Sequence, residues 1–170
     1  FMLSKILKKS DCASCRFCCS FRRQSLWETP VFDKKTKELL EKKYKNAKFT
    51  PIGKSSFTIN LLDLYKTQNP EEEVSCPFLD SKNGCSLCEQ EKPFDCKIWP
   101  LRVIKKSSGN ENAIVLMNTC PSVNKIPLSD LKEFVKADLA QKIFDYAKAY
   151  PDIVKDFSKD FQFCVELFSR

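Results

Sequence analysis

The sequence contains no histidine, and this absence narrows the chemistry open to it. Serine and cysteine hydrolases that depend on an imidazole base are excluded. Catalytic zinc usually carries histidine as well. A zinc or iron site in this chain must therefore be built from thiolates, with a carboxylate as a further option, and such a site favours structural zinc or an iron–sulfur cluster.

Glycine and long apolar runs are also scarce. The chain has three glycines and no glycine-rich loop after a strand, so it does not look like a self-contained methyltransferase with its own S-adenosylmethionine site. No run of about 18 apolar residues occurs, and we expect no transmembrane helix. The stretch 2–9 is too short and too charged for a secretory signal. We therefore expect a cytoplasmic protein, in which disulfides among its cysteines are the less favoured alternative.

The formal charge of +7 depends on how the ten cysteines are treated. It counts them as neutral, whereas a tetrathiolate zinc or an oxidised four-iron cluster carries a net charge of about −2. Two such sites would lower the charge to roughly +3. Basic residues near cysteines are candidates to balance the sites: Arg16, Arg22, Arg23, Lys97 and Arg102. No basic stretch is interleaved with aromatic residues, so nucleic acid is not the expected partner.

Four cysteines lie within the eight residues 12–19, at positions Cys12, Cys15, Cys18 and Cys19. Two residues separate each of the first three, an interval that ferredoxin cluster loops share and zinc knuckles approximate. Buried structural thiols have no reason to gather at this interval. Side chains of adjacent residues diverge along an extended backbone, so Cys18 and Cys19 are expected to serve different sites unless one stays free. We infer a soft-metal protein with two sites.

A second cysteine-rich segment runs from Cys76 to Cys96. Cys76 and Cys120 are each followed by proline, as is the last ligand of bacterial ferredoxin loops. The proline fixes the chain direction after the ligand and removes one amide donor. Gly84 permits a tight turn that brings Cys85 back towards the centre.

The pattern Cys-x2-Cys-x2-Cys-Cys, followed by Cys-Pro-Phe-Leu, Gly-Cys and Pro-x-x-Cys-x-x-x-Pro, resembles the zinc- or iron-chelating cysteine-cluster family. Flagellin lysine N-methylases carry a similar cluster. The resemblance extends from Cys12 to about Pro100, and it implies eight metal ligands: Cys12, Cys15, Cys18, Cys19, Cys76, Cys85, Cys96 and, as a further member, Cys120. Relatives usually have an aromatic residue at the position of Cys88 and an arginine at that of Lys92. Cys88 is therefore an extra ligand or a bystander, and Cys164, outside the motif, is interpreted as a core thiol.

Local patterns predict the secondary structure. Asp33 is the expected N-cap of a helix over 34–46, and the alternation over 57–61 predicts a half-buried strand. Residues 101–106 and 113–117 are expected to form a hairpin around the turn at 107–110. From Ser129, the expected N-cap, apolar residues recur every four positions to Ile143 and predict a helix that ends at Pro151. The tail 161–168 is expected to dock, with a final strand as one option.

These elements predict an α+β fold, a small cysteine-rich metal-centred domain with a short antiparallel sheet and packed helices. We expect residues 2–126 to form the cysteine-cluster domain, with residues 127–170 as a C-terminal helical segment packed on it in a single compact unit.

Three functions are compatible with this pattern. The favoured one is an iron–sulfur protein, with a 4Fe-4S cluster, that carries electrons or serves as a cluster-bearing accessory to another enzyme. The partner would be a redox or methyl-transfer enzyme, and no membrane is expected to take part. The alternatives are a zinc-stabilised binding module and a methyltransferase-related enzyme component. No catalytic residue is assigned.

Overall fold

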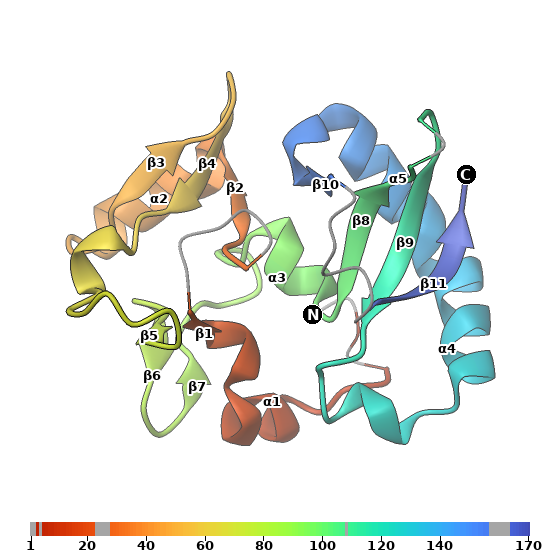
Figure 1. Ribbon diagram of the computed structural model, residues 1–170, viewed down its shortest axis with the longest axis horizontal. Helices are drawn as coiled ribbons and strands as arrows, with labels where there is room; N and C mark the ends of the chain where they lie inside the picture. Colours follow the sequence, from red (N-terminus) through yellow and green to blue (C-terminus); the bar gives the residue numbers. More distant parts are fainter. Residues whose placement is uncertain (1–2, 4, 23–27, 108, 157–163) are drawn as a thin grey trace. The chain divides into compact units, whose positions relative to one another are not determined.

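The computed structural model describes residues 3, 5–22, 28–107, 109–156 and 164–170, and it mixes helices with small sheets (Figure 1). The α+β composition that the sequence predicts is therefore confirmed. The chain forms two compact units. We call residues 9–97 the cysteine-rich unit, and residues 1–8 together with 98–170 the sheet unit. The predicted domain division at residues 126 and 127 falls inside the sheet unit.

The cysteine-rich unit consists of short elements. In chain order they are α1 (Lys9–Cys15), η1 (Phe17–Cys19), β1 (Ser20–Phe21), β2 (Val31–Asp33), α2 (Lys34–Lys43), β3 (Phe49–Pro51), β4 (Ser56–Ile59), η2 (Leu62–Leu64), β5 (Val74–Ser75), β6 (Leu79–Asp80), β7 (Gly84–Cys85) and α3 (Phe94–Ile98). The strands form a three-stranded sheet in the order β2-β4-β3 and two pairs, β1-β5 and β6-β7, all antiparallel.

An aromatic core holds these small sheets together. Phe32 packs edge-on against Phe49, and Tyr44 packs edge-on against Phe78, each with ring centroids 5.1 Å apart. Helix α2 contributes Leu40 to this core, while the rest of its surface is largely exposed, as its lysine and glutamate content predicts. Because the three sheets share one core, their connecting loops are fixed against one another.

The Asp33 side chain caps α2, as predicted. It accepts hydrogen bonds from the backbone N–H of Thr36 at 2.9 Å and from the Thr36 hydroxyl at 2.7 Å. The helix ends at Lys43, a few residues before the expected end. The predicted strand over 57–61 is also present, as β4.

The sheet unit contains β8 (Leu101–Lys105), β9 (Asn112–Met117), η3 (Val123–Lys125), α4 (Leu128–Phe134), the π-helical turn η4 (Val135–Leu139), α5 (Ala140–Ala149), η5 (Pro151–Ile153), β10 (Val154–Lys155) and β11 (Cys164–Ser169). Its strand order is β10-β8-β9-β11. The predicted hairpin is confirmed as antiparallel β8 and β9, and part of the tail is the strand β11, antiparallel to β9. Residues 161–163 of the predicted tail lie outside the described residues.

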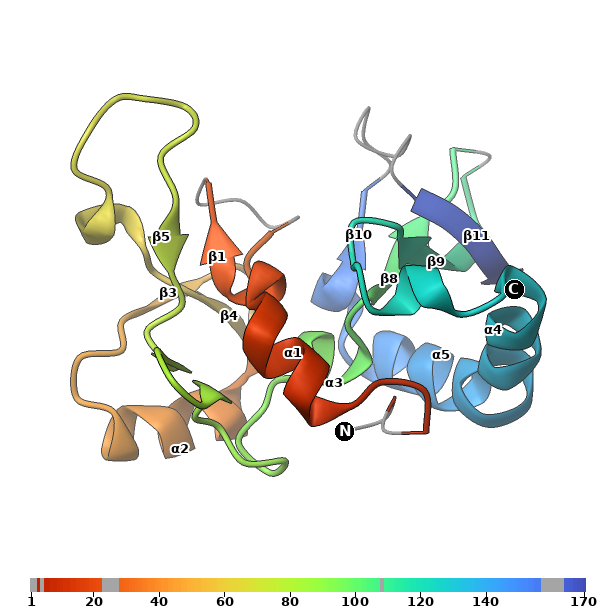
Figure 2. The same ribbon diagram turned by 90° about the horizontal axis from the view of Figure 1, so that it is seen from below.

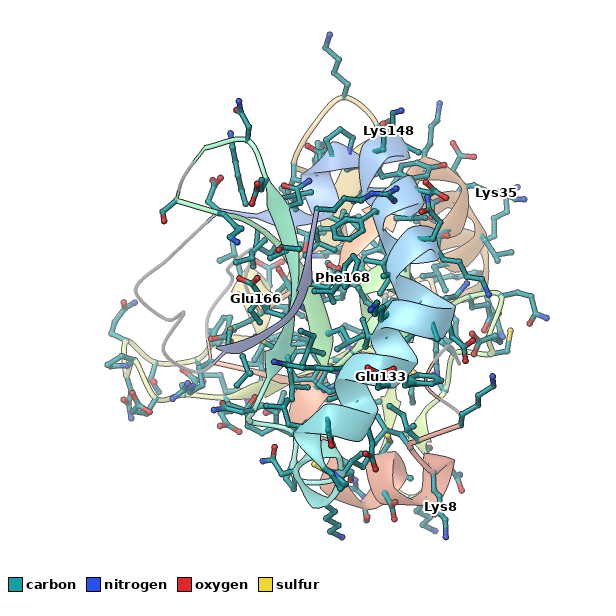
Figure 3. The ribbon with its side chains drawn as sticks, turned by 90° about the vertical axis from the view of Figure 1, so that its right-hand side faces the viewer. Lys8, Lys35, Glu133, Lys148, Glu166 and Phe168 are labelled. Carbon is teal, nitrogen blue, oxygen red and sulfur yellow. The ribbon has the colours of Figure 1, made fainter. Side chains whose placement is uncertain are left out.

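Helices α4 and α5 lie along one face of this sheet in the view of Figure 2. The Phe168 ring of β11 lies 6.1 Å from the Phe144 ring of α5, and Figure 3 shows this strand beside the helix. Within the described residues, no helix combines the length and the apolar character needed to span a membrane.

The prediction of Ser129 as an N-cap is wrong. Helix α4 begins at Leu128, so Pro127 occupies the cap position and the Ser129 hydroxyl bonds to Asp130 instead. Pro127 has a ψ of 135°, the non-helical conformation of an N-cap residue, and its carbonyl accepts from the N–H of Leu131 at 3.1 Å. The predicted single helix is also divided by the π-helical turn. A π-helical turn is wider than an α-helical one, so apolar residues spaced four apart stay on one face across it. All four predicted apolar positions are buried: Leu131, Val135, Leu139 and Ile143.

Candidate metal centre

Seven of the eight predicted ligands lie in the cysteine-rich unit, and Cys120 lies in the sheet unit. Their positions are Cys12 and Cys15 in α1, Cys18 and Cys19 in η1, Cys76 directly after β5, Cys85 in β7, and Cys96 in α3. No disulfide joins any of the ten cysteines, all of which are among the described residues.

Strand pairing brings the two cysteine segments together. Ser20 of β1 pairs with Ser75 of β5, which places Cys19 and Cys76 at the same end of the ladder. The backbone N–H of Cys76 donates to the carbonyl of Cys19 at 2.7 Å. Sequence spacing alone gives no signal for this contact, because the two residues belong to separate segments.

The β6–β7 hairpin adds Cys85 to this group. Leu79 pairs with Cys85 in the hairpin, and the Leu79 N–H donates to the carbonyl of Cys76 at 2.9 Å. Gly84 has a φ of +80°, a conformation that glycine adopts without strain, so the predicted turn before Cys85 is present. The hairpin therefore returns Cys85 to the neighbourhood of Cys76.

Helix α1 packs directly on this hairpin. A Cβ atom at Gly84 would lie 2.9 Å from the Cα of Ala13, closer than real Cβ contacts come. The absence of a side chain at Gly84 thus allows α1, which carries Cys12 and Cys15, to approach the strand that carries Cys85.

The thiol of Cys76 has a strongly perturbed pKa. This pKa is raised from 9.0 to about 12, chiefly by burial. The backbone N–H of Phe78 opposes the rise, and the charges of Cys85 and Cys18 add to it. Cys18 and Cys85 thus lie near enough to Cys76 to act on its thiol, although the three residues come from separate segments. Thiolates bind metals and thiols do not, so a bound cation would reverse the protonation that burial favours here.

The thiols converge without forming a coordination shell. Among the described residues, no group of three cysteine or carboxylate side chains is arranged closely enough to hold a metal ion. The donor set itself, thiolates with nearby carboxylates, fits zinc or an iron–sulfur cluster. The eight-ligand set, including Cys120 in the other unit, therefore stays a prediction.

Two buried carboxylates near the cysteines carry structural contacts that the sequence did not indicate. Asp95, only 1% exposed, accepts a hydrogen bond from the backbone N–H of Val31 at 2.9 Å. Glu91 accepts one from Lys43 Nζ at 2.6 Å and one from the N–H of Cys88 at 3.0 Å. Hydrogen bonds from Lys43 and then from Cys88 lower the pKa of Glu91, although burial opposes them. Val31 and Lys43 are distant in sequence from these carboxylates and leave no local signal, whereas Cys88 lies three positions from Glu91.

The two cysteines outside the predicted ligand set also have defined surroundings. Cys88 is exposed, and its thiol interacts with the carboxylate of Glu91. Cys164 is half-buried at the start of β11, where its thiol donates to the sulfur of Met117 at 3.1 Å. These contacts suit Cys164 to serve as a control residue in ligand substitutions.

No family model, curated protein or solved structure matches the chain. The family resemblance in the cysteine spacing, and the metal ligands that it implies, therefore remain predictions.

Proposed function

We propose that this protein binds an iron–sulfur cluster through its cysteine-rich unit and acts in electron transfer or as a cluster-bearing accessory to another enzyme. The observation that supports this most is the strand pairing of one unit, which brings Cys19, Cys76 and Cys85 together from three separate segments of the chain. Cys76 and Cys85 also pack against the aromatic core of this unit. A reducing, cytoplasmic setting would keep them available.

A 4Fe-4S cluster takes four cysteine ligands, and the candidates in the cysteine-rich unit are Cys12, Cys15, Cys18, Cys19, Cys76, Cys85 and Cys96. The eighth predicted ligand, Cys120, belongs to the other unit. When bound, the cluster supplies one-electron redox chemistry, with a potential set by its hydrogen bonds, charge and exposure. The chain's own contribution is to hold Cys76 half-buried and to leave Cys15 exposed, which keeps the site near the surface. Each thiol that becomes a ligand releases its proton.

An exposed edge of the centre also suits a partner protein. Phe17, in the middle of the cysteine run, is 49% exposed although it is a large apolar side chain. Exposed aromatic side chains are typical anchors of protein interfaces. A redox or methyl-transfer enzyme is the partner we propose, and it would bring the substrate site that this chain does not supply.

The first test is the metal content of protein purified without oxygen. We expect iron and sulfide in equal amounts, together with broad visible absorption. Cys76→Ala should lose most of this absorption, because it removes a thiol from the convergent group, whereas Cys164→Ala should retain it. A colourless protein with one or two zinc ions would instead favour the zinc-stabilised binding module. Protein with neither metal, after iron and sulfide are supplied, would contradict a metal function.

A further inference from the structure

The cysteine run contains one residue whose backbone conformation is unfavourable for its type. Arg16, between Cys15 and Cys18, has a φ of 55° in the left-handed region. Among the described residues other than glycine, it alone has a positive φ. A Cβ atom makes this conformation costly, and glycine adopts it freely. An arginine at this position therefore indicates that its side chain makes interactions that compensate for the backbone cost.

The backbone of Arg16 forms the bend between α1 and η1. Its N–H donates to the carbonyl of Cys12 at 3.1 Å, and its carbonyl accepts from the N–H of Cys19 at 3.0 Å. The first and last cysteines of the run thus both bond to this residue. Its left-handed conformation allows the chain to turn between them.

The side chain of Arg16 joins the cysteine run to the β6–β7 hairpin. Its Nε donates to the carbonyl of Ala13 at 3.2 Å, in the last turn of α1. Its terminal nitrogen donates to the carbonyl of Ser81, in the turn between β6 and β7. One planar guanidinium group therefore bonds to both segments, and lysine, with a single ammonium group, is a poor replacement for it.

A second contact in the same place requires close approach. Ala13, whose carbonyl Arg16 binds, is also the residue that packs on Gly84. Arg16 and Gly84 thus both hold α1 against the β6–β7 hairpin, the first by hydrogen bonds and the second by allowing close packing. This contact joins the two segments that carry Cys12, Cys15 and Cys85.

We propose that Arg16 is a positioning residue of the candidate metal centre, which holds the 12–19 segment against the β6–β7 hairpin and thereby fixes the thiols of both. The functional meaning of this role rests on the proposed function, because it takes these thiols as metal ligands. The contacts themselves do not depend on any metal.

The test uses the full-length, reduced, metal-free protein and brief alkylation with iodoacetamide, followed by mass spectrometry of each cysteine. Arg16→Gly removes the side chain and relieves the backbone. We expect alkylation of Cys18 and Cys85 to accelerate about tenfold, the effect of losing one hydrogen bond to a charged group. Cys88 and Cys164 serve as internal references and should change less than about twofold.

Two further variants test whether the effect comes from the shape of the Arg16 side chain, from its charge or from a general loss of stability. Arg16→Lys keeps the charge and should give an intermediate rate, because one ammonium group does not reproduce both contacts. Arg170→Ala removes an exposed arginine of the sheet unit, whose side chain donates to Gln141, and it should behave like the wild type. If Arg16→Gly fails to fold, the comparison of Arg16→Lys with the wild type still tests the proposal.

Several outcomes would overturn this role. They are an unchanged alkylation pattern in Arg16→Gly, an equal acceleration at Cys164, which would indicate general destabilisation, and wild-type behaviour of Arg16→Lys. Metal content is measured separately on the same proteins. Wild-type protein that binds no metal would contradict the proposed function but not the positioning role of Arg16. Arg16→Gly protein that keeps its cluster and its alkylation pattern would contradict only the role of Arg16.

Discussion

Glu91 is a buried carboxylate held between an ammonium group and a backbone amide. Its side chain is 8% exposed, whereas the Lys43 side chain that binds it is 53% exposed. The charge of Lys43 thus stays hydrated while the carboxylate does not. The hydrogen bonds from Lys43 and Cys88 favour the ionised form, and they lower the pKa of Glu91 despite its burial.

This residue should give the protein a measurable acid sensitivity. Because the folded pKa of Glu91 lies below its ordinary value of 4.5, its contribution to stability is complete above that value and is lost as the pH falls through the folded pKa. Glu91→Gln should therefore flatten the decline in the free energy of unfolding below about pH 5. Urea titrations at several pH values measure the free energy of unfolding of each variant. Glu38→Gln, at an exposed carboxylate, should leave the decline unchanged, and an equal effect of both variants would contradict the assignment.

The sequence predicts those residues whose partners are near in the chain. Asp33 was recognised as a cap because its partner, Thr36, lies three positions away. The contact of Asp95 with Val31 and the pairing of Glu91 with Lys43 leave no such signal, since these partners lie 64 and 48 positions away. Ser129 is a residue type that favours the N-cap position, but it is not the cap. The helix starts before it, with Pro127 in the cap position.

Helix α2 offers a test at the scale of elements. Asp33→Ala removes the side chain that accepts from the Thr36 N–H and hydroxyl, and it should lower the free energy of unfolding by about 1 kcal/mol. Ser129→Ala is the matched control, since its hydroxyl caps no helix, and it should change stability by less than about 0.5 kcal/mol. Chemical denaturation measures both variants. A larger loss in Ser129→Ala would contradict the capping assignments.

The packing of α1 on the β6–β7 hairpin gives a second test. Gly84 and Gly109 both have positive φ values, +80° and +108°, but only Gly84 has a neighbour that an added Cβ would strike. Gly109→Ala should cost about 1 kcal/mol from backbone strain alone. Gly84→Ala should cost about 3 kcal/mol, because Ala13 backbone must also shift. Equal losses in urea unfolding would show that α1 has room to move away.

At the scale of elements, the sequence predicts adjacent strands better than distant ones. The β8–β9 hairpin is visible because its strands alternate around a turn signal. The parallel pairing of β10 with β8 is not visible, since two helices intervene and β10 has only two residues. The approach of the two cysteine segments is not visible in the sequence for the same reason, because it depends on the two-residue pairing of β1 with the distant strand β5.

For the whole molecule, the two units should respond differently to metal removal. The predicted ligands lie mainly in the cysteine-rich unit, and metal binding there would contribute folding energy to that unit. A chelator should therefore raise amide hydrogen exchange in β1, β5 and β7, while β8, β9 and α5 change little. Cys76→Ala, if it binds less metal, should show a smaller response. Equal acceleration in both units would contradict a metal centre confined to the cysteine-rich unit.

The division of the chain could not be predicted, because it depends on which strands pair. The partners of β8 all follow it in sequence, so residues 98–126 group with the C-terminal helices. The cysteine motif up to Cys96 falls within one unit, although the expected boundary at residue 126 does not coincide with the end of that unit. Spacing between ligands is a local property, whereas the partners of a strand are not.

The cysteine-rich unit is inserted between two parts of the sheet unit, since residues 1–8 group with residues 98–170. Leu3 and Leu7 are buried, yet the strands and helices of their unit come more than ninety residues later in the chain. During synthesis, the cysteine-rich unit is therefore complete before the strands and helices of the sheet unit are made. If it binds metal as proposed, we expect the metal to bind while the chain is still on the ribosome. In ribosome-stalled chains that expose only residues 1–97, Cys76 should already be shielded from alkylation, and full reactivity there would show that maturation waits for the last strand.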